Sequence, residues 1–168
     1  MFKFRASALI AFSGFIWFAA GLYLLQLGLH FLLESAKLAN EGMYAGPLLS
    51  LLAPIGSFEQ AILLLVVIGL SIGFLKGKFV LSKTVRKTVE RILSFKPPVP
   101  FMKMYSAKYC ILLGSMMLLG MSFKFFGFSL DVRGLVDVAI GSALINGSVL
   151  YFRQALAARN AERAEVYL

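Results

Sequence analysis

The sequence predicts an all-α integral membrane protein with four transmembrane helices, arranged as two hairpins with a basic amphipathic helix between them. The first observation is composition: 60% of the residues are hydrophobic and 15% are charged, against about 45–50% and about 25% in soluble domains. The second is a set of long uncharged apolar runs, and the third is the clustering of basic residues between those runs. We therefore expect one membrane domain over residues 1–168.

The first two predicted spans cover residues 6–33 and 58–78. The first run has 28 residues, which as a helix would be about 42 Å long, more than the roughly 30 Å of hydrocarbon. It also exceeds the apolar core of a signal peptide, about 7–15 residues, so we expect a tilted, permanent span. The second is short and reaches full length only if Lys76 and Lys78 extend their ammonium groups to the interface.

The third and fourth predicted spans cover residues 109–127 and 134–152, interrupted by Lys124 and by Asp137 respectively. An N-terminus in the cytoplasm puts 14 of the 17 basic residues on that side, as the positive-inside rule requires. We therefore expect a multi-pass protein of the cell membrane whose N-terminus and C-terminal tail, 153–168, are both cytoplasmic. Since the +9 charge is distributed between apolar runs, we expect no nucleic-acid partner.

Two connecting segments have patterns of their own. The outer segment 43–57 is apolar and contains Pro47 and Pro54. We interpret it as an interfacial or capping segment, with a re-entrant loop as the alternative.

The cytoplasmic loop 79–108 begins with a helical pattern over 79–93. Its apolar face is Leu81, Val85, Val89 and Ile92, and its opposite face carries Lys83, Arg86, Lys87, Glu90 and Arg91. This pattern is typical of a helix that lies in the headgroup plane of a membrane. We therefore expect Lys83, Arg86, Lys87 and Arg91 to bind anionic lipid.

Small residues recur at fixed intervals in the apolar runs. Gly69, Gly73 and Gly77 are four apart in the second span, as are Ala139, Ala143 and Gly147 in the fourth. Such a glycine-zipper stripe lets helix backbones approach closely in lipid, so we expect these two spans to meet, or each to line a helix contact. Gly21 and Gly28 are seven apart, as are Gly120 and Gly127. The matching intervals suggest an internal repeat in which the two hairpins are related.

Polar residues inside or beside membrane spans are the candidate functional positions. The candidate cluster is Gln26, His30, Lys124, Asp131, Arg133, Asp137 and Asn146. One interpretation is an outward-facing cavity that binds a small solute or ion. The one we favour is structural: Lys124 and Arg133 pair with Asp131 and Asp137, and Asn146 hydrogen-bonds across the small-residue contact.

No catalytic, nucleotide-binding or metal-ligand motif occurs in the sequence, so we expect neither an enzyme nor a cofactor or metal site. The favoured function is a non-enzymatic accessory or scaffold protein that binds a membrane partner or anionic lipid. A small oligomeric transporter or channel is the alternative, because four spans enclose too little volume for a pathway in one copy. A membrane enzyme acting on lipid comes third.

Overall fold

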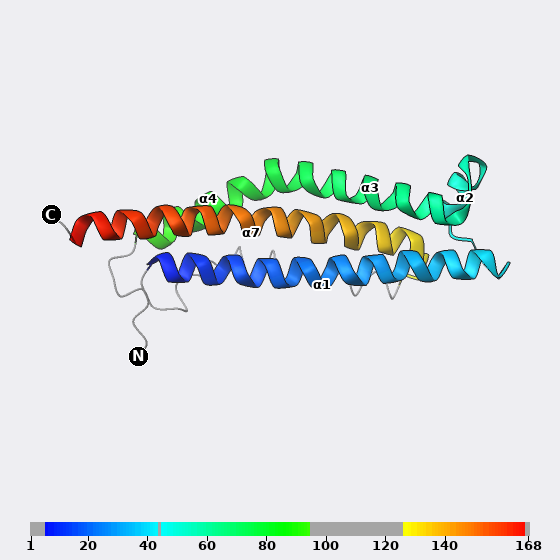
Figure 1. The fold of residues 1–168 in the computed structure, drawn as a ribbon, viewed down its shortest axis with the longest axis horizontal. Coiled ribbons are helices and arrows are strands. Elements are labelled where there is room, and N and C mark those ends of the chain that lie inside the picture. The colour runs from blue at the N-terminus through cyan, green and yellow to red at the C-terminus, as the bar shows by residue number, and fades with distance from the viewer. Residues whose placement is uncertain (1–5, 44, 95–125, 167–168) are drawn as a thin grey trace.

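The computed structural model describes residues 6–43, 45–94 and 126–166, which are helical apart from short turns and contain no strand. The α-helices are α1 (Ala6–Asn40), α2 (Pro47–Leu52), α3 (Phe58–Lys76), α4 (Ser82–Ser94) and α7 (Leu130–Val166) (Figure 1). A 3-10 turn, Ala53–Ile55, follows α2, and a π-helical turn, Gly77–Leu81, joins α3 to α4. The predicted all-helical class is confirmed for these residues.

Three helices are long and apolar enough to cross a membrane: Ala6–Asn40, Phe58–Phe79 and Leu130–Ala164. They contain the first, second and fourth predicted spans. The third predicted span lies outside the described residues except for its last two, Phe126 and Gly127, which form a turn.

Helices α1 and α7 lie side by side along most of their length and run in opposite directions (Figure 1). A Cβ atom on Gly28 would lie 2.7 Å from the Val138 amide nitrogen, and one on Gly21 would lie 2.9 Å from the Gly141 carbonyl oxygen. On α7, Gly134 and Gly141 are packed as closely against α1. Glycines at intervals of seven on both helices therefore bring the two backbones into direct contact.

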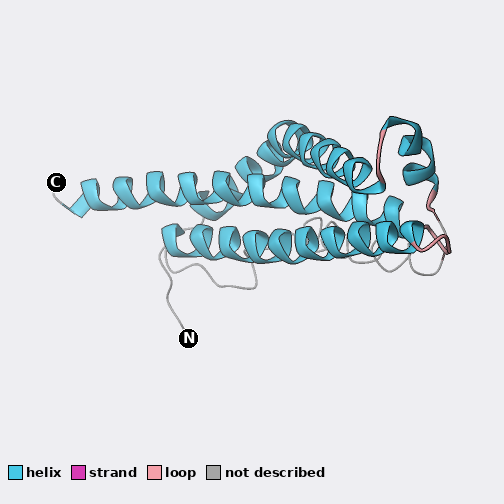
Figure 2. Cartoon of the chain, turned by 45° about the vertical axis from the view of Figure 1, so that its right-hand side comes forward, coloured by secondary structure: helices cyan, strands magenta, loops and turns pink. Residues whose placement is uncertain are grey.

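Helix α3 packs on a different face of α7 and runs parallel to it, inclined to the α1–α7 pair (Figure 2). Gly69 faces Leu135 and Val138, and Gly77 faces Ala143 and Asn146. Between them, a Cβ on Gly73 would collide with the Ala139 carbonyl oxygen. The second and fourth predicted spans therefore do lie in contact, with Gly69 and Gly73 of α3 and Gly77 directly after it on the contacting face.

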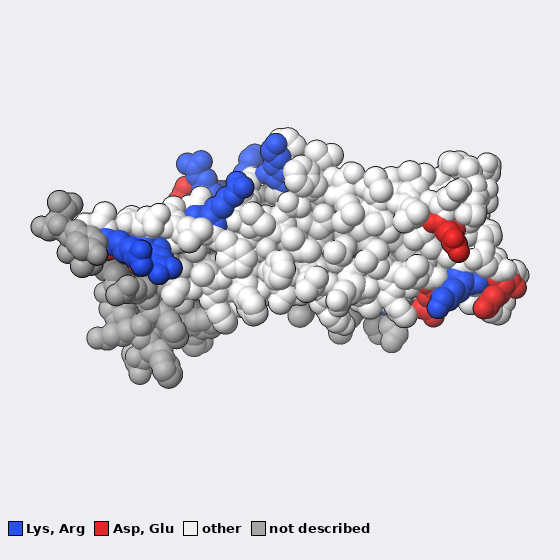
Figure 3. Space-filling view, viewed as in Figure 1, with Lys and Arg blue, Asp and Glu red and all other residues white. Residues whose placement is uncertain are grey.

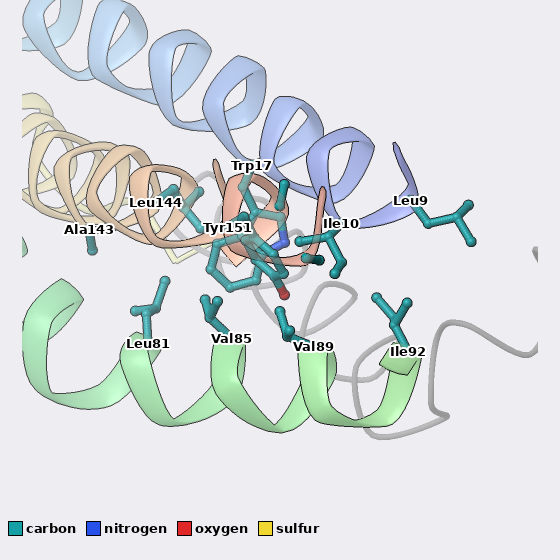
Figure 4. Packing of buried hydrophobic residues seen from close by; sticks show 12 residues of the cluster. Leu9, Ile10, Trp17, Leu81, Val85, Val89, Ile92, Ala143, Leu144 and Tyr151 are labelled. Carbon is teal, nitrogen blue, oxygen red and sulfur yellow. The ribbon is translucent and has the colours of Figure 1, made fainter. Parts of the chain in front are cut away.

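The apolar face of α4 is covered by protein. Val85, Val89 and Ile92 are buried against α1 and α7 in a cluster that includes Trp17 and Tyr151 (Figure 4). The amphipathic pattern correctly predicted which residues share the buried face. Helix α4 thus presents this face to the ends of α1 and α7 rather than to lipid.

A second apolar cluster closes the opposite end, where α2 and the start of α3 cover α1 and α7. Leu49 of α2 is fully buried there, while Leu51 and Ile55 point outward with about 70% of their surface exposed. The outer segment is thus a short helix that covers the ends of the long helices, as the capping interpretation predicts.

Gly127 does not occupy the position that the predicted repeat assigns to it. Gly28 lies in the α1–α7 contact, whereas Gly127 lies in the turn before α7, with φ of +63° and nothing within 4 Å of a Cβ built on it. A positive φ favours glycine, so the backbone conformation accounts for the glycine at this position. The seven-residue interval from Gly120 to Gly127 therefore does not indicate a helix contact at Gly127. The rest of the predicted third span, which includes Gly120, lies outside the described residues.

Candidate functional site

The two ends of the helix bundle carry opposite charge. Lys and Arg side chains gather over α4 and the last turns of α7, and acidic side chains gather at the other end (Figure 3). Between these ends the described surface is uncharged and mostly apolar, with exposed Phe, Leu, Ile and Val on α1 and α3. An apolar belt between two charged ends is the distribution that a bilayer requires.

The basic end is built on α4. Its four predicted headgroup residues, Lys83, Arg86, Lys87 and Arg91, are all exposed. The Arg86 Nε atom donates to the Glu90 carboxylate at 2.9 Å, but both side chains remain mostly in solvent, 80% and 61% exposed, so this pair contributes little to stability. Lys76 and Lys78, just before α4, are also exposed. The cations therefore form one accessible surface on a helix whose other face is fixed to the bundle.

The tail of α7 holds the first turn of α1 at this same end. The Glu162 carboxylate accepts hydrogen bonds from the Ser7 backbone N–H at 3.2 Å and from the Ser7 hydroxyl at 2.9 Å. The first N–H groups of a helix have no partner within the helix, and a carboxylate there also interacts favourably with the helix dipole. The basic end is therefore a joined unit of α1, α4 and α7.

Asp131 performs the corresponding task at the opposite, acidic end. Its side chain is fully buried, and one carboxylate oxygen accepts from the Leu48 and Leu49 N–H groups at 2.7 and 3.1 Å. The other accepts from the Val132 N–H at 2.8 Å. Gly46 fits because a Cβ there would collide with this carboxylate. Asp131 thus caps α2, whereas the sequence suggested an ion pair with Lys124 or Arg133.

Arg133 and Asp137 lie one turn apart on α7. The Arg133 guanidinium lies over the Phe31 ring, 4.3 Å from its centre, in a cation–π contact. Asp137 is buried, with 5% of its surface exposed. No salt bridge or hydrogen bond joins Asp137 to another of the residues that the structure describes. Among the described residues, Arg133 therefore contacts Phe31 and does not form the predicted ion pair with Asp131 or Asp137.

Gln26 and His30 lie on the side of α1 that faces away from α7, and both are exposed. The His30 Nε2 atom is 3.8 Å from the Glu34 carboxylate, one turn along the same helix. Lys124 lies outside the described residues. The predicted polar cluster is therefore dispersed: Asp131 points to α2, Arg133 covers Phe31, and Gln26 and His30 point outward.

Asn146 lies on the side of α7 that faces α3, but its side-chain amide makes its hydrogen bond within α7 and not to α3. Its Nδ2 atom donates to the Ser142 carbonyl of its own helix at 3.0 Å. The bond across the contact comes instead from the Ser142 hydroxyl, which donates to the Leu70 carbonyl at 3.2 Å. Ser142 was missed because a lone serine among small residues gives no signal in the sequence.

The described residues contain no group of three or more His, Cys, Asp or Glu side chains placed to hold a metal ion. The arrangement is suited to binding charged groups, because it has an exposed row of cations at one end and an acidic surface at the other. Comparison with known proteins adds no relative, since no protein-family model, curated protein or solved structure matches the chain.

Proposed function

We propose that this chain is a non-enzymatic membrane accessory or scaffold protein whose basic end binds anionic lipid headgroups. The observation that carries the proposal is the two-sided packing of α4: its apolar side chains are buried against α1 and α7, while Lys83, Arg86, Lys87 and Arg91 are all exposed. A fixed helix holds its cations in place before binding, so less conformational entropy is lost when a phosphate is bound.

Charge distribution supports the choice of lipid as the ligand. Arg153, Arg159 and Arg163 are exposed at the same end as α4, so the basic side chains follow the rim of the apolar belt, where headgroups lie. Each Lys or Arg near an anionic membrane surface contributes about 1 kcal/mol of attraction. The dispersal of the outer polar residues also favours a scaffold over a solute transporter, because a binding site needs several polar groups that converge.

We also propose that the basic end faces the cytoplasm in a protein that crosses the membrane four times. The excess of Lys and Arg at that end supports the orientation. Helix α4 ends at the basic end and α7 begins at the opposite end, which supports a further crossing by the predicted span 109–127. The opposite orientation would be established by a reporter fused after Leu168 that is active only outside the cell.

The lipid proposal is tested by native mass spectrometry of the purified protein in a neutral detergent. Phosphatidylglycerol should remain bound in preference to phosphatidylcholine. Changing Lys83, Arg86, Lys87 and Arg91 together to Gln should abolish that preference, and added salt should weaken it in the wild type. The matched control is Lys37→Gln at the acidic end, which should leave the preference unchanged. Equal phosphatidylglycerol retention by the fourfold variant and the wild type would refute the proposal.

A further inference from the structure

Helix α1 has a second face that repeats at coiled-coil intervals. Its first face, with Gly14, Gly21 and Gly28, contacts α7. On the opposite side, Ala19, Tyr23, Gln26, His30 and Leu33 follow one another at intervals of four and three, and all five are exposed. Alternation of three and four is the pattern by which one helix packs along another in a left-handed coiled coil. We call these five residues the outer α1 face.

Two polar side chains of the outer α1 face, Tyr23 and Gln26, lie within the apolar belt. The Arg133 guanidinium covers Phe31, which places the adjacent His30 near the charged edge of the belt. Gln26 is one turn deeper, about 6 Å along the helix, and Tyr23 is deeper still. Tyr23 is 65% exposed, and no hydrogen bond joins Tyr23 or Gln26 to any other residue in the described parts of the chain.

Lipid tails offer no hydrogen bonds, so an amide that faces them loses the partners it had in water. Ser71 on α3 shows how an exposed polar group in this chain avoids that loss, because its hydroxyl donates to the Val67 carbonyl of its own helix at 2.7 Å. Gln26 has no such bond. We infer that the outer α1 face binds a second copy of this chain, with Gln26 of one copy hydrogen-bonded to Gln26 of the other.

Insertion in a bilayer places the same residues of two copies opposite one another. Copies inserted in one orientation are related by a twofold axis along the membrane normal, which brings each residue of a helix to the depth of its counterpart. A glutamine amide carries both donors and an acceptor, so it pairs with a copy of itself. Ala19, the smallest residue of the face, lets the two helices approach closely deeper in the membrane.

Charge at the outer end of α1 agrees with a second copy as the partner. Lys37 continues the outer α1 face four residues after Leu33, with Glu34 before it and Glu41 just after the end of α1, and all three are exposed. In two α1 helices at equal depth, the two Lys37 side chains therefore lie together between the glutamates of both copies. This association does not depend on lipid binding by α4, which lies at the opposite end.

The test is cysteine cross-linking of the full-length protein in lipid vesicles, with Cys110 replaced by Ser. Ala19→Cys should give a disulfide-linked dimer on oxidation, and Ser71→Cys, on the exposed face of α3, should not. Gln26→Leu should raise the dimer dissociation constant about three- to ten-fold. Gln26→Asn should restore part of the affinity, while Ser71→Ala should have no effect.

Three results would overturn the inference. One is a wild-type protein that stays monomeric at every protein-to-lipid ratio in single-molecule photobleaching. The second is equal cross-linking at positions 19 and 71, which would indicate random collision. The third is a dimer whose affinity is unchanged by Gln26→Leu, which would place the contact on another face. Loss of the phosphatidylglycerol preference in the fourfold α4 variant, with dimerisation intact, would leave both proposals standing separately.

Discussion

The contact of α1 with α7 and the contact of α3 with α7 use small residues at different intervals. On α1 the contacting glycines are seven residues apart, at Gly14, Gly21 and Gly28, and the helices are antiparallel. On α3 and at the first residue after it they are four apart, at Gly69, Gly73 and Gly77, and the helices are parallel. A seven-residue repeat keeps one helix aligned along another over many turns, whereas a four-residue repeat suits a crossing over a short length.

The two contacts therefore differ in extent. The α1–α7 contact continues from the Ser7–Glu162 hydrogen bonds to the packing of Leu32 on Gly134. The glycine contact of α3 and the turn after it is confined to the nine residues from Gly69 to Gly77. We conclude that the α1–α7 pair is the stable centre of the fold and that α3 is attached to it, which the following changes test.

The largest effect is expected from Gly28→Leu. A Cβ there would lie 2.7 Å from one α7 backbone atom and 2.8 Å from another, so no side-chain adjustment can make room and the helices must separate. We expect a loss of about 3 kcal/mol in the free energy of unfolding, measured by circular dichroism as dodecyl sulfate is titrated into neutral micelles.

The matched control for Gly28→Leu is Ala8→Leu, which adds bulk at an exposed position of the same helix. It should change the unfolding free energy by less than about 0.5 kcal/mol. Equal destabilisation by the two variants would show that the α1–α7 contact is not the stable centre.

A smaller effect is expected from Gly73→Leu. The new side chain would collide with the Ala139 carbonyl and with Ser142, whose Cβ lies 2.7 Å away, but α3 can move outward while α1 and α7 stay paired. We expect a loss of about 2 kcal/mol, with the emission of the only tryptophan, Trp17, unchanged in the native state. Ser71→Leu, which faces outward on the same helix, is the control. A shift of Trp17 emission in Gly73→Leu would contradict the prediction that α1 and α7 stay paired when α3 moves.

Asp131→Ala should release the cap on α2 at the acidic end. It removes the acceptor of the Leu48 and Leu49 N–H groups, at a cost of about 1 to 2 kcal/mol. Hydrogen exchange of residues 45–57 should accelerate, with no change near Glu162. Asp131→Asn keeps an acceptor oxygen and should exchange at an intermediate rate, so equal exchange in both variants would argue against capping.

Much of this fold could be predicted from hydropathy, and the reason it could not all be predicted is visible in α4. Periodicity determines that Val85, Val89 and Ile92 share a face, but lipid and protein cover such a face equally well. Asp131 is a second case, because the N–H groups that it binds are 82 and 83 residues away in the chain. Proximity in sequence to Arg133 suggested an ion pair, and only the position of α2 reveals the cap.

The α1–α7 contact was visible in the sequence in part. Gly21 and Gly28 are seven residues apart, and so are Gly134 and Gly141. The shared interval is a signal that these two helices pack together, although spacing alone does not say which helices are partners. The interval between Gly120 and Gly127 has the same length, but Gly127 lies in a turn. A seven-residue interval between glycines can therefore reflect a helix contact or a turn.

The smallest effect is expected from Ser142→Ala, which tests whether polarity adds to the α3–α7 contact. The Ser142 hydroxyl donates to the Leu70 carbonyl at 3.2 Å, and interhelical hydrogen bonds in membranes contribute about 0.6 kcal/mol on average. Ser71→Ala removes a hydroxyl that bonds only within its own helix and should change the unfolding free energy less. Because alanine keeps the Cβ that packs against Gly73, the difference between the two variants measures the hydrogen bond alone. A difference near zero would mean that α3 is held to α7 by close packing of glycine, as α1 is within the membrane, and that the two contacts differ in interval but not in kind.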